Sequence, residues 1–362
     1  MVDWDALEAA GIADARDRAG LVEYLDGLGF SAEEMADAER QGRLFGLAGD
    51  TAGRSGPPIY SLRTAAETLG VPVGDIERAW TMLGLSVAGP DTLALSQADV
   101  DSLALWVEMR SRLGEPVDGF LRVLGATMAR LAEAESSMIR LTQPDMWLGH
   151  TGDELTTARA WRAVASYIPR IGAMIDAVHR QHQVSHRTFL EGLAGGASAS
   201  IVCGVGFADL TGFTALTRVL TAAELSTLLS EFGGTVADVV HADGGRVVKF
   251  IGDAVMWVSS TPKLLAKAAV DLVNHPKARE AGLQVRAGLA YGEVVAIVGD
   301  YFGTPVNLAA RLVDAAAPGQ VLASTCVRDK LPDWPATRQE PLTLKGFDEP
   351  VPAYELNLAA DR

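Results

Sequence analysis

The chain has 362 residues, of which 48% are hydrophobic, and a formal net charge of −15. This length predicts two domains, and the acidic charge argues against nucleic acid as a partner, because phosphate backbones are bound by clustered basic residues. No run reaches the roughly eighteen apolar residues of a membrane span and no leader peptide opens the chain, so we expect a cytoplasmic protein without a membrane span. Cys203 and Cys326 fit no metal or redox motif and are expected to be small core residues.

Residues 1–195 predict an all-helical domain. Apolar residues recur there at helical spacing between turns that contain Gly or Pro, and nothing alternates as a strand would. The small residues of 193–200 predict a flexible linker, which places the domain boundary at 195/196. The apolar interior of such a helical domain leaves open a lipid or fatty acid bound between its helices.

Residues 60–80 have a sequence pattern typical of a helix-turn-helix. One interpretation is a DNA-binding element, which would make the protein a DNA-binding regulator. The other is a structural helical hairpin. The second predicted helix carries Asp75, Glu77 and Arg78, which is too acidic for approach to phosphates without a basic surround. We therefore favour the structural hairpin.

A long junction helix is predicted at about residues 168–193, with Pro169 in its first turn. Apolar and histidine side chains recur on one of its faces at three- and four-residue steps, a pattern typical of a seam that pairs with another helix, such as its symmetry mate. These residues are Ile168, Ile171, Ile175, Val178, His182, His186, Phe189 and Leu193.

Three of the six histidines lie on this helix, at His179, His182 and His186. Histidine changes charge near neutral pH. Burial of His182 and His186 in a seam would disfavour their charged forms, so that acidification would disturb the packing. The alternative is a set of solvent-facing histidines on a polar helix end, and the sequence leaves both open.

Residues 196–362 predict an α+β domain. The order of its elements is β-α-β-β-α-β, the order of a ferredoxin-like sandwich. Strands are expected at 201–208, 246–251, 254–259, 283–290, 293–298, 320–324 and 352–357, and helices at 221–241, 262–274 and 305–316.

Asp209 and Asp253 are each expected where an apolar strand gives way to a turn that contains glycine. If the two strands are neighbours, the carboxylates meet at one edge of the sheet and can bind two Mg²⁺ or Mn²⁺ ions that share phosphate oxygens. Aspartate is also common in turns for purely structural reasons.

A phosphate-binding turn is expected directly after Asp209. Gly212 allows close approach of the backbone to an anion, and the next helix offers unpaired N–H groups. We expect Thr211, Gly212, Phe213 and Thr214 to hold the terminal phosphates of a nucleotide.

Asn307 and Arg311 are one helical turn apart and project together. The planar guanidinium of Arg311 suits the charge that develops on a phosphorus under attack, and the Asn307 amide suits a sugar hydroxyl. A helix cap and a surface ion pair are the structural alternatives.

These segments, in this order and spacing, resemble the catalytic domain of class III nucleotidyl cyclases over about residues 200–358, including Leu344–Phe347 and Val351–Leu356. The resemblance implies that Asp209 and Asp253 bind two divalent cations, Mg²⁺ or Mn²⁺. It also implies that Asn307 and Arg311 stabilise the transition state, that Lys249 and Asp300 recognise the purine, and that Lys345 contacts the triphosphate. Family members act as homodimers in which each active site is shared between the subunits.

The first half of the chain resembles the regulatory domains of soluble actinobacterial adenylyl cyclases. Some of these domains inhibit the catalytic domain and respond to pH. The resemblance implies regulation of the second domain by the first.

The pair Lys249 and Asp300 favours ATP as substrate. Adenine offers an acceptor at N1 and donors at N6, which match a donating ammonium and an accepting carboxylate. Guanine offers the reverse, and each buried group left unpaired costs about 1–3 kcal/mol. The family's guanylyl cyclases typically carry Glu and Cys at these positions. We therefore expect an adenylyl cyclase that makes 3′,5′-cyclic AMP and pyrophosphate.

Three alternatives remain. The first is a guanylyl cyclase, and the second is a diguanylate cyclase. Diguanylate cyclases need a Gly-Gly-[Asp/Glu]-[Asp/Glu]-Phe hairpin where this chain has Phe250–Ala254. That family also lacks the Asn-x-x-x-Arg helix that this chain carries. The third is a DNA-binding regulator with a degenerate nucleotide-sensing domain.

Overall fold

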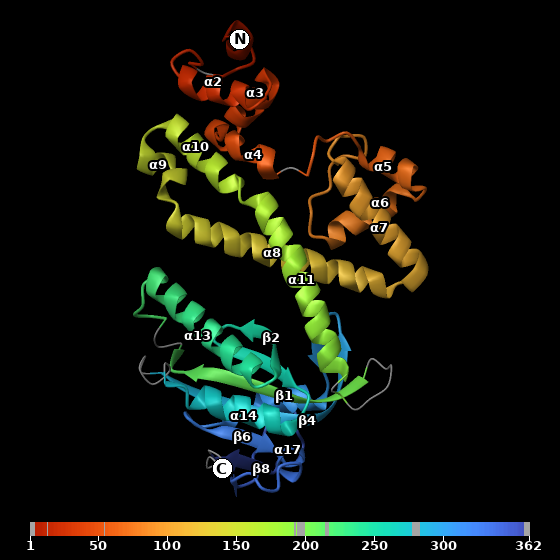
Figure 1. The fold of residues 1–362 in the computed structure, drawn as a ribbon, viewed down its shortest axis with the longest axis vertical. Coiled ribbons are helices and arrows are strands. Elements are labelled where there is room, and N and C mark those ends of the chain that lie inside the picture. The colour runs from red at the N-terminus through yellow and green to blue at the C-terminus, as the bar shows by residue number, and fades with distance from the viewer. Residues whose placement is uncertain are drawn as a thin grey trace. The chain divides into compact units, whose positions relative to one another are not determined.

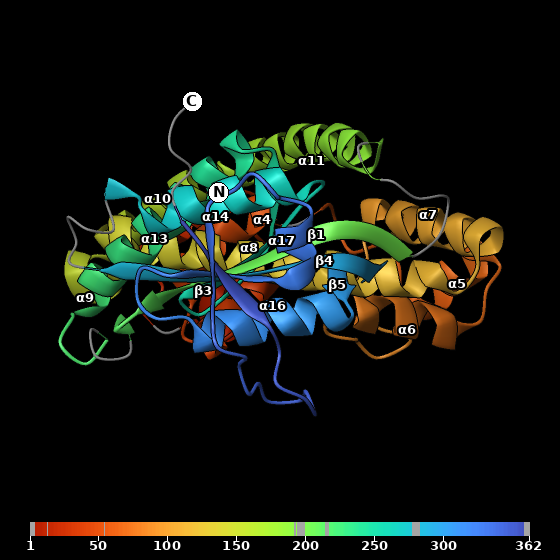
Figure 2. The ribbon, with the colours of Figure 1, turned by 90° about the horizontal axis from the view of Figure 1, so that it is seen from below.

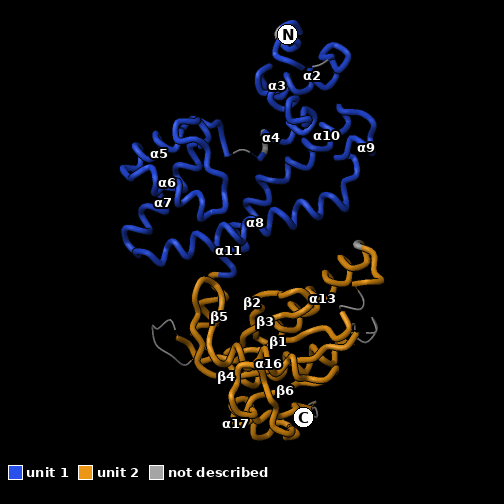
Figure 3. The backbone as a smooth tube through the Cα atoms, turned by 180° about the vertical axis from the view of Figure 1, so that it is seen from behind, with its two compact units in different colours: residues 1–182 blue, residues 183–362 orange. Residues whose placement is uncertain are grey.

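The computed structural model describes residues 4–12, 14–53, 55–191, 193, 200–213, 217–276 and 283–357. The chain divides into two compact units, residues 1–182 and 183–362 (Figure 3). The division falls inside helix α11 (Ile168–Glu191), so the last turns of this helix belong to the second unit. The predicted boundary at 195/196 lies outside the described residues.

The first unit is helical, as predicted (Figure 1). Tyr60 and Leu95 form an isolated antiparallel bridge within it. Its α-helices are α1 (Trp4–Ala9), α2 (Ala19–Gly27), α3 (Ala32–Arg40), α4 (Leu47–Gly53), α5 (Leu62–Leu69), α6 (Val73–Met82), α7 (Gln97–Leu113), α8 (Pro116–Thr142), α9 (Leu148–Thr151), α10 (Glu154–Ala165) and the first part of α11, and two 3₁₀ turns lie at Leu44–Gly46 and Pro144–Met146.

The helical hairpin predicted at residues 60–80 consists of α5 and α6. Ser61 caps α5 through a capping box, and Gly70 ends that helix in the left-handed conformation. Arg78 of α6 donates a hydrogen bond of 3.0 Å to the buried Asp118 of α8. The one cation of the would-be recognition helix is therefore neutralised within the unit, which favours the structural interpretation.

Two apolar cores hold this unit together. One joins α1 to α4 and α10 around Leu25, Met35 and Leu44. The other joins α5 to α8 around Ile76, Leu103 and Trp106. Their separation makes α5 to α8 a distinct helical module.

The second unit has the predicted β-α-β-β-α-β order, which confirms the ferredoxin-like fold. The strands that the structure describes form one eight-stranded sheet in the order β2-β3-β1-β4-β6-β8-β7, with β5 paired to β4. The elements are β1 (Ser200–Thr211), α13 (Ala222–Ala242), β2 (Gly245–Ile251), β3 (Ala254–Ser259), α14 (Pro262–Val273), β4 (Gln284–Ile297), β5 (Asp300–Phe302), α16 (Thr304–Ala315), β6 (Val321–Ser324), α17 (Thr325–Asp329), β7 (Ala336–Arg338) and β8 (Ala353–Leu356).

Helices cover both faces of this sheet, α13 and α14 on one and α16 on the other (Figure 2). Successive side chains of β1 alternate between the faces: Leu210 packs in the core under α13 and α14, and Phe207 packs in the core under α16. Helix α16 approaches β4 so closely that a Cβ at Gly288 would lie 2.3 Å from the Ala309 carbonyl oxygen. Only glycine fits there, and this contact fixes the height of α16 above the sheet.

Four expectations need correction. The strands predicted at 283–290 and 293–298 are one continuous strand, β4. Asp209 lies inside β1, two residues before its end, because this strand runs on to Thr211. Strands β5 and β7 were not predicted. Cys326 is exposed, whereas Cys203 is buried as expected.

In the described part of the chain, no helix has both the length and the apolarity needed to cross a membrane.

Candidate active site

Two aspartates meet at one edge of the sheet. In the β1–β3 pairing Asp209 faces Ala254, and Asp253 directly precedes Ala254 in the two-residue turn that joins β2 to β3. Burial raises the pKa of Asp253, and the charge of Asp209 raises it further. The site thus holds two carboxylates that repel each other, which a shared cation would relieve.

This donor set fits divalent cations. Mg²⁺ typically binds through one or two carboxylates and completes its shell with water and substrate phosphates. Among the described residues, no group of three metal-ligating side chains occurs. A site with two carboxylates therefore fits Mg²⁺ or Mn²⁺ that arrives with a nucleotide, rather than a permanently bound structural metal.

Arg286 is a site residue that the sequence analysis missed. It faces Asp209 across the β1–β4 pairing and donates to Asp209 Oδ2 from Nη2 at 2.7 Å and from Nε at 3.1 Å. Its Nη1 donates to the carbonyl of Asp314 at the end of α16 at 3.0 Å. Arg286 therefore orients Asp209 and ties it to the helix that carries Asn307 and Arg311. The feature of the sequence that could have pointed to Arg286 is its position as the lone arginine in the apolar segment 283–290.

The predicted phosphate turn begins at the end of β1. The Thr211 hydroxyl donates to the carbonyl of Gln284 at 2.7 Å, and Gly212 has a φ of 85°. Only glycine adopts that conformation without strain, and it leaves the backbone open to an approaching anion. Phe213 packs against the core under α13, and Thr214 lies outside the described residues.

Lys249 of β2 and Asp300 of β5 contact each other through Nζ and Oδ2. The other carboxylate oxygen of Asp300 accepts from the Tyr301 backbone N–H at 2.8 Å. Asp300 follows a tight turn in which both Val298 and Gly299 have positive φ, the geometry of a type I′ hairpin. The structure thus brings together the two residues expected to recognise the purine.

Asn307 and Arg311 lie one turn apart on α16, with the Asn307 side chain exposed. Arg311 Nη1 contacts Asp314 Oδ2 at 3.0 Å in a partly exposed ion pair. Such a pair contributes little to stability. Arg311 is therefore free to exchange Asp314 for a phosphate.

The predicted residues form separate groups within one copy of the chain. No hydrogen bond or ion pair among the described residues joins Lys249 and Asp300 to Asp209 and Asp253. Lys345 lies exposed in a turn that follows the buried Leu344.

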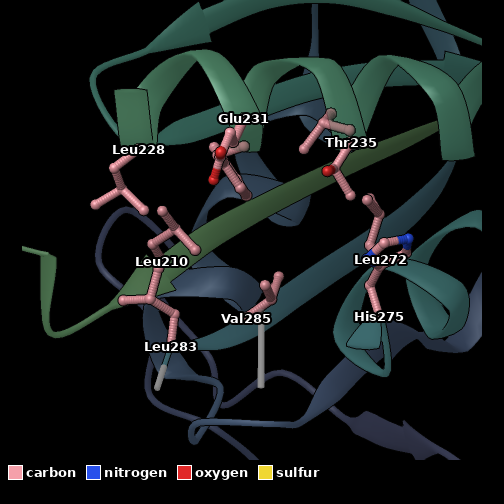
Figure 4. A pocket seen from close by; sticks show the side chains of 10 residues that line it. Leu210, Leu228, Glu231, Thr235, Leu272, His275, Leu283 and Val285 are labelled. Carbon is pink, nitrogen blue, oxygen red and sulfur yellow. The ribbon is translucent and has the colours of Figure 1, made fainter. Parts of the chain in front are cut away.

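An apolar pocket lies beneath the carboxylate edge, on the other face of β1 (Figure 4). Leu210 and Val285, the neighbours of Asp209 and Arg286, form its floor, and Leu228 and Glu231 project into it from α13. The carboxylate edge and this pocket thus lie on opposite faces of the same strands.

The three histidines of α11 differ in environment. His179 and His182 are exposed, whereas His186 is half-buried and its Nδ1 contacts Arg246 of β2. The Arg246 guanidinium also lies 5.4 Å from the centre of the Phe189 ring, and Phe189 is buried. Burial, and then the charge of Arg246, lower the pKa of His186. The end of α11 is therefore attached to the sheet of the second unit through His186 and Phe189.

Comparisons with known proteins cover both units. Residues 198–357 match the family model of the adenylate and guanylate cyclase catalytic domain, and residues 4–187 match that of the adenylate cyclase regulatory domain. A Mycobacterium tuberculosis protein named only as uncharacterized is 66% identical over 98% of this chain and 94% of its own.

Relatives with named activities are more distant. An adenylate cyclase of Streptomyces coelicolor is 33% identical over 75% of this chain and 71% of its own. A pH-sensitive adenylate cyclase of M. tuberculosis is 32% identical over 91% of this chain and 84% of its own. Among solved structures, the adenylyl cyclase CyaB from P. aeruginosa aligns with a TM-score of 0.41 and 28% identity, over 44% of this chain and 96% of that one. The chain belongs to the class III nucleotidyl cyclases, with an adenylate cyclase regulatory domain in front of the catalytic domain.

Proposed function

We propose that the protein converts ATP to 3′,5′-cyclic AMP and pyrophosphate at a site shared by two copies of the chain. The observation that carries this proposal is the contact between Lys249 and Asp300 in a unit that also presents Asp209 and Asp253 at one sheet edge. The first pair selects the base, and the second provides carboxylates for cations.

Asp209 and Asp253 would hold two divalent cations, Mg²⁺ or Mn²⁺. When bound, these ions acidify the ribose 3′-hydroxyl and neutralise the triphosphate. Arg286 keeps Asp209 oriented through its two bonds to Oδ2. The backbone at Gly212 would approach the β- and γ-phosphates, and Lys345 would add a cation on the solvent side.

Asn307 and Arg311 would act on the reacting atoms. The 3′-oxygen attacks the α-phosphorus in line with the departing pyrophosphate, and negative charge builds on the equatorial oxygens. The Arg311 guanidinium would bind two of those oxygens in place of Asp314, and the Asn307 amide would orient the ribose.

The base is recognised by a pair that keeps hydrogen-bonding capacity. An ammonium has three donors, so Lys249 can contact Asp300 and still donate to adenine N1. Asp300 Oδ2 accepts from Lys249 and has a second lone pair for the N6 amino group. Their mutual contact holds both groups in position before the nucleotide binds.

Exposed apolar side chains support a homodimer. Phe250 and Ile251 lie between Lys249 and Asp253 in sequence, and three more flank Asp300: Ile297, Val298 and Phe302. Large apolar side chains grouped on a surface mark an interaction site. A second copy covering them would place one copy's Asn307 and Arg311 against the other copy's carboxylates.

Purified full-length protein should turn over ATP but not GTP. We expect cyclic AMP and pyrophosphate in equal amounts when Mn²⁺ and ATP are supplied, measured by chromatography of the products. Cyclic GMP or a dinucleotide as the main product would identify one of the other cyclase activities instead. Absence of any product with both nucleotides, together with retarded DNA in a gel-shift experiment, would favour the DNA-binding regulator.

We further propose that His186 makes the attachment of α11 pH-sensitive. Neutral His186 accepts from Arg246, whereas protonated His186 would place two cations in contact. Its pKa in the folded protein lies below the ordinary value of 6.5. The attachment is therefore fully stable above that ordinary value and weakens as the pH falls through the lowered pKa.

His186→Gln should flatten the pH dependence of cyclase activity below about pH 6.5, because glutamine accepts a hydrogen bond but does not titrate in this range. His182→Gln, at an exposed position one turn earlier, is the matched control and should leave the profile unchanged. Activity is measured from about pH 5 to 8. Superimposable profiles for wild type and His186→Gln would exclude this switch.

A lipid or fatty acid ligand of the first unit stays a prediction. That unit contains an apolar cavity of about 610 Å³ lined by residues of α4, α8, α10 and the start of α11, among them Met138, Trp161 and Ile171. Mass spectrometry of an organic extract of the purified protein tests it, and an extract without any lipid argues against it.

A further inference from the structure

A second cavity of the first unit lies within the helical module α5 to α8. It has a volume of about 200 Å³ and lies between α6, α7 and α8, where α8 packs against both other helices (Figure 1). Its walls are almost wholly apolar and rich in aromatic rings, with Trp80, Trp106, Met109, Phe120, Leu121 and Leu124. Apolar cavities of about 150 Å³ bind benzene. This one therefore has room for a substituted aromatic ring.

Among the described residues that line the cavity, Trp106 has a buried polar group without a partner. The indole of Trp106 is only 4% exposed, and its Nε1 makes no hydrogen bond to any residue that the structure describes. A buried donor without an acceptor is unfavourable, and native proteins rarely keep one. The hydroxyl of Ser102, which also lines the cavity, already donates to the Ala98 carbonyl at 2.8 Å. The complementary ligand is thus apolar with a single hydrogen-bond acceptor.

The charges beside the cavity balance each other. The Arg110 guanidinium lies 5.3 Å from the centre of the Trp106 ring, with carboxylate oxygens of Asp118 and Asp75 at 3.7 and 3.8 Å. Arg78 pairs with the other oxygen of Asp118 at 3.0 Å. Two cations therefore face two anions, and no net charge remains to attract a carboxylate. A neutral ligand fits this environment better than an acid.

The rim of the cavity is accessible. Leu105, Phe120 and Leu124 line it, yet each is exposed at the surface. An apolar molecule can therefore enter between α7 and α8 without unfolding of the module.

We propose that the first unit binds a small neutral aromatic molecule between α6, α7 and α8, with the Trp106 indole N–H donating to the ligand's one acceptor. This site shares no lining residue with the larger cavity beside Trp161. It gives the regulatory unit a specificity for a chemical class unrelated to the nucleotide substrate.

Acetophenone and ethylbenzene test the proposal with full-length protein, because they differ only in the carbonyl oxygen. Isothermal titration calorimetry should show acetophenone binding roughly threefold to tenfold more tightly, the value of one net hydrogen bond. Trp106→Phe removes the donor and should erase this preference while ethylbenzene binds as before. No binding of either molecule, or a preference that persists in Trp106→Phe, would overturn the proposal.

A second pair of variants separates the cavity from general effects on the fold. Leu124→Trp fills the cavity from its rim, where Leu124 is 37% exposed, and should abolish binding of both molecules. Leu141→Trp places the same side chain at a position 64% exposed on the same helix outside the lining, and should retain binding. Circular dichroism confirms that both variants are folded.

Two further results would contradict the proposal. Benzoate binding more tightly than acetophenone would contradict the neutral ligand class. The second result combines two observations: the wild type binds neither probe, and sedimentation shows that Leu124→Trp changes self-association. That combination would mean that a second copy of the chain covers this cavity.

Discussion

Asp253→Asn should lower kcat for cyclic AMP formation by at least about a thousandfold, because a bound metal supplies several kcal/mol of transition-state stabilisation. The substitution keeps the size of the side chain and removes one of the two carboxylates at the sheet edge. Since Asp253 sits in the turn between β2 and β3 and burial already disfavours its charge, the neutral amide should not unfold the domain. Asp209→Asn should act similarly and also release Arg286.

The measurement is initial-rate kinetics with Mn²⁺ and ATP, alongside thermal unfolding. Asp238→Asn, at an exposed aspartate of α13, is the matched control and should retain activity. A folded Asp253→Asn protein with activity near wild type would exclude the metal assignment.

Replacing Lys249 by Glu together with Asp300 by Cys should transfer the preference from ATP to GTP. The contact between these side chains makes them one recognition unit, so both must change. Each mismatched buried contact costs about 1–3 kcal/mol. Two mismatches predict a fall of roughly a hundredfold or more in kcat/KM for ATP, together with a gain for GTP.

This prediction is checked by kcat/KM for both nucleotides in wild type, both single variants and the double variant. Either single variant should be poor with both substrates, because a half-changed pair matches neither base. A double variant that still prefers ATP would show that other residues recognise the purine.

Many residues of the proposed site could be selected from sequence because they lie next to glycine-containing turns. The hairpin around Gly252 and Asp253 and the helix with Asn307 and Arg311 are local patterns. Arg286 is different, because its importance lies in facing Asp209 across the sheet, 77 residues away. Cross-strand register is set by the whole fold and leaves little signal in one sequence.

Strand β4 shows the same limit. Two strands were expected at 283–290 and 293–298, yet Gly292 between them pairs with Cys203 inside one continuous strand. A Cβ at this position would lie 3.0 Å from Pro305, so the glycine makes room for the first turn of α16. Sequence shows the glycine but not whether it ends a strand or admits a neighbouring helix.

The histidines of α11 look alike in the sequence, but their contacts in the fold differ. His182 and His186 share the predicted seam, but only His186 contacts Arg246. Arg246 comes from a strand 60 residues later in the chain. The pairing of this seam with a second copy stays a prediction.

Mixing two inactive variants tests the shared site most directly. Asp253→Ala and Arg311→Ala damage complementary parts of the proposed site, so a heterodimer keeps one intact site and one doubly damaged site. With random assortment, equal amounts should restore about a quarter of wild-type cyclic AMP formation. No recovery, in a mixture whose differently tagged chains copurify, would contradict a site built from two copies.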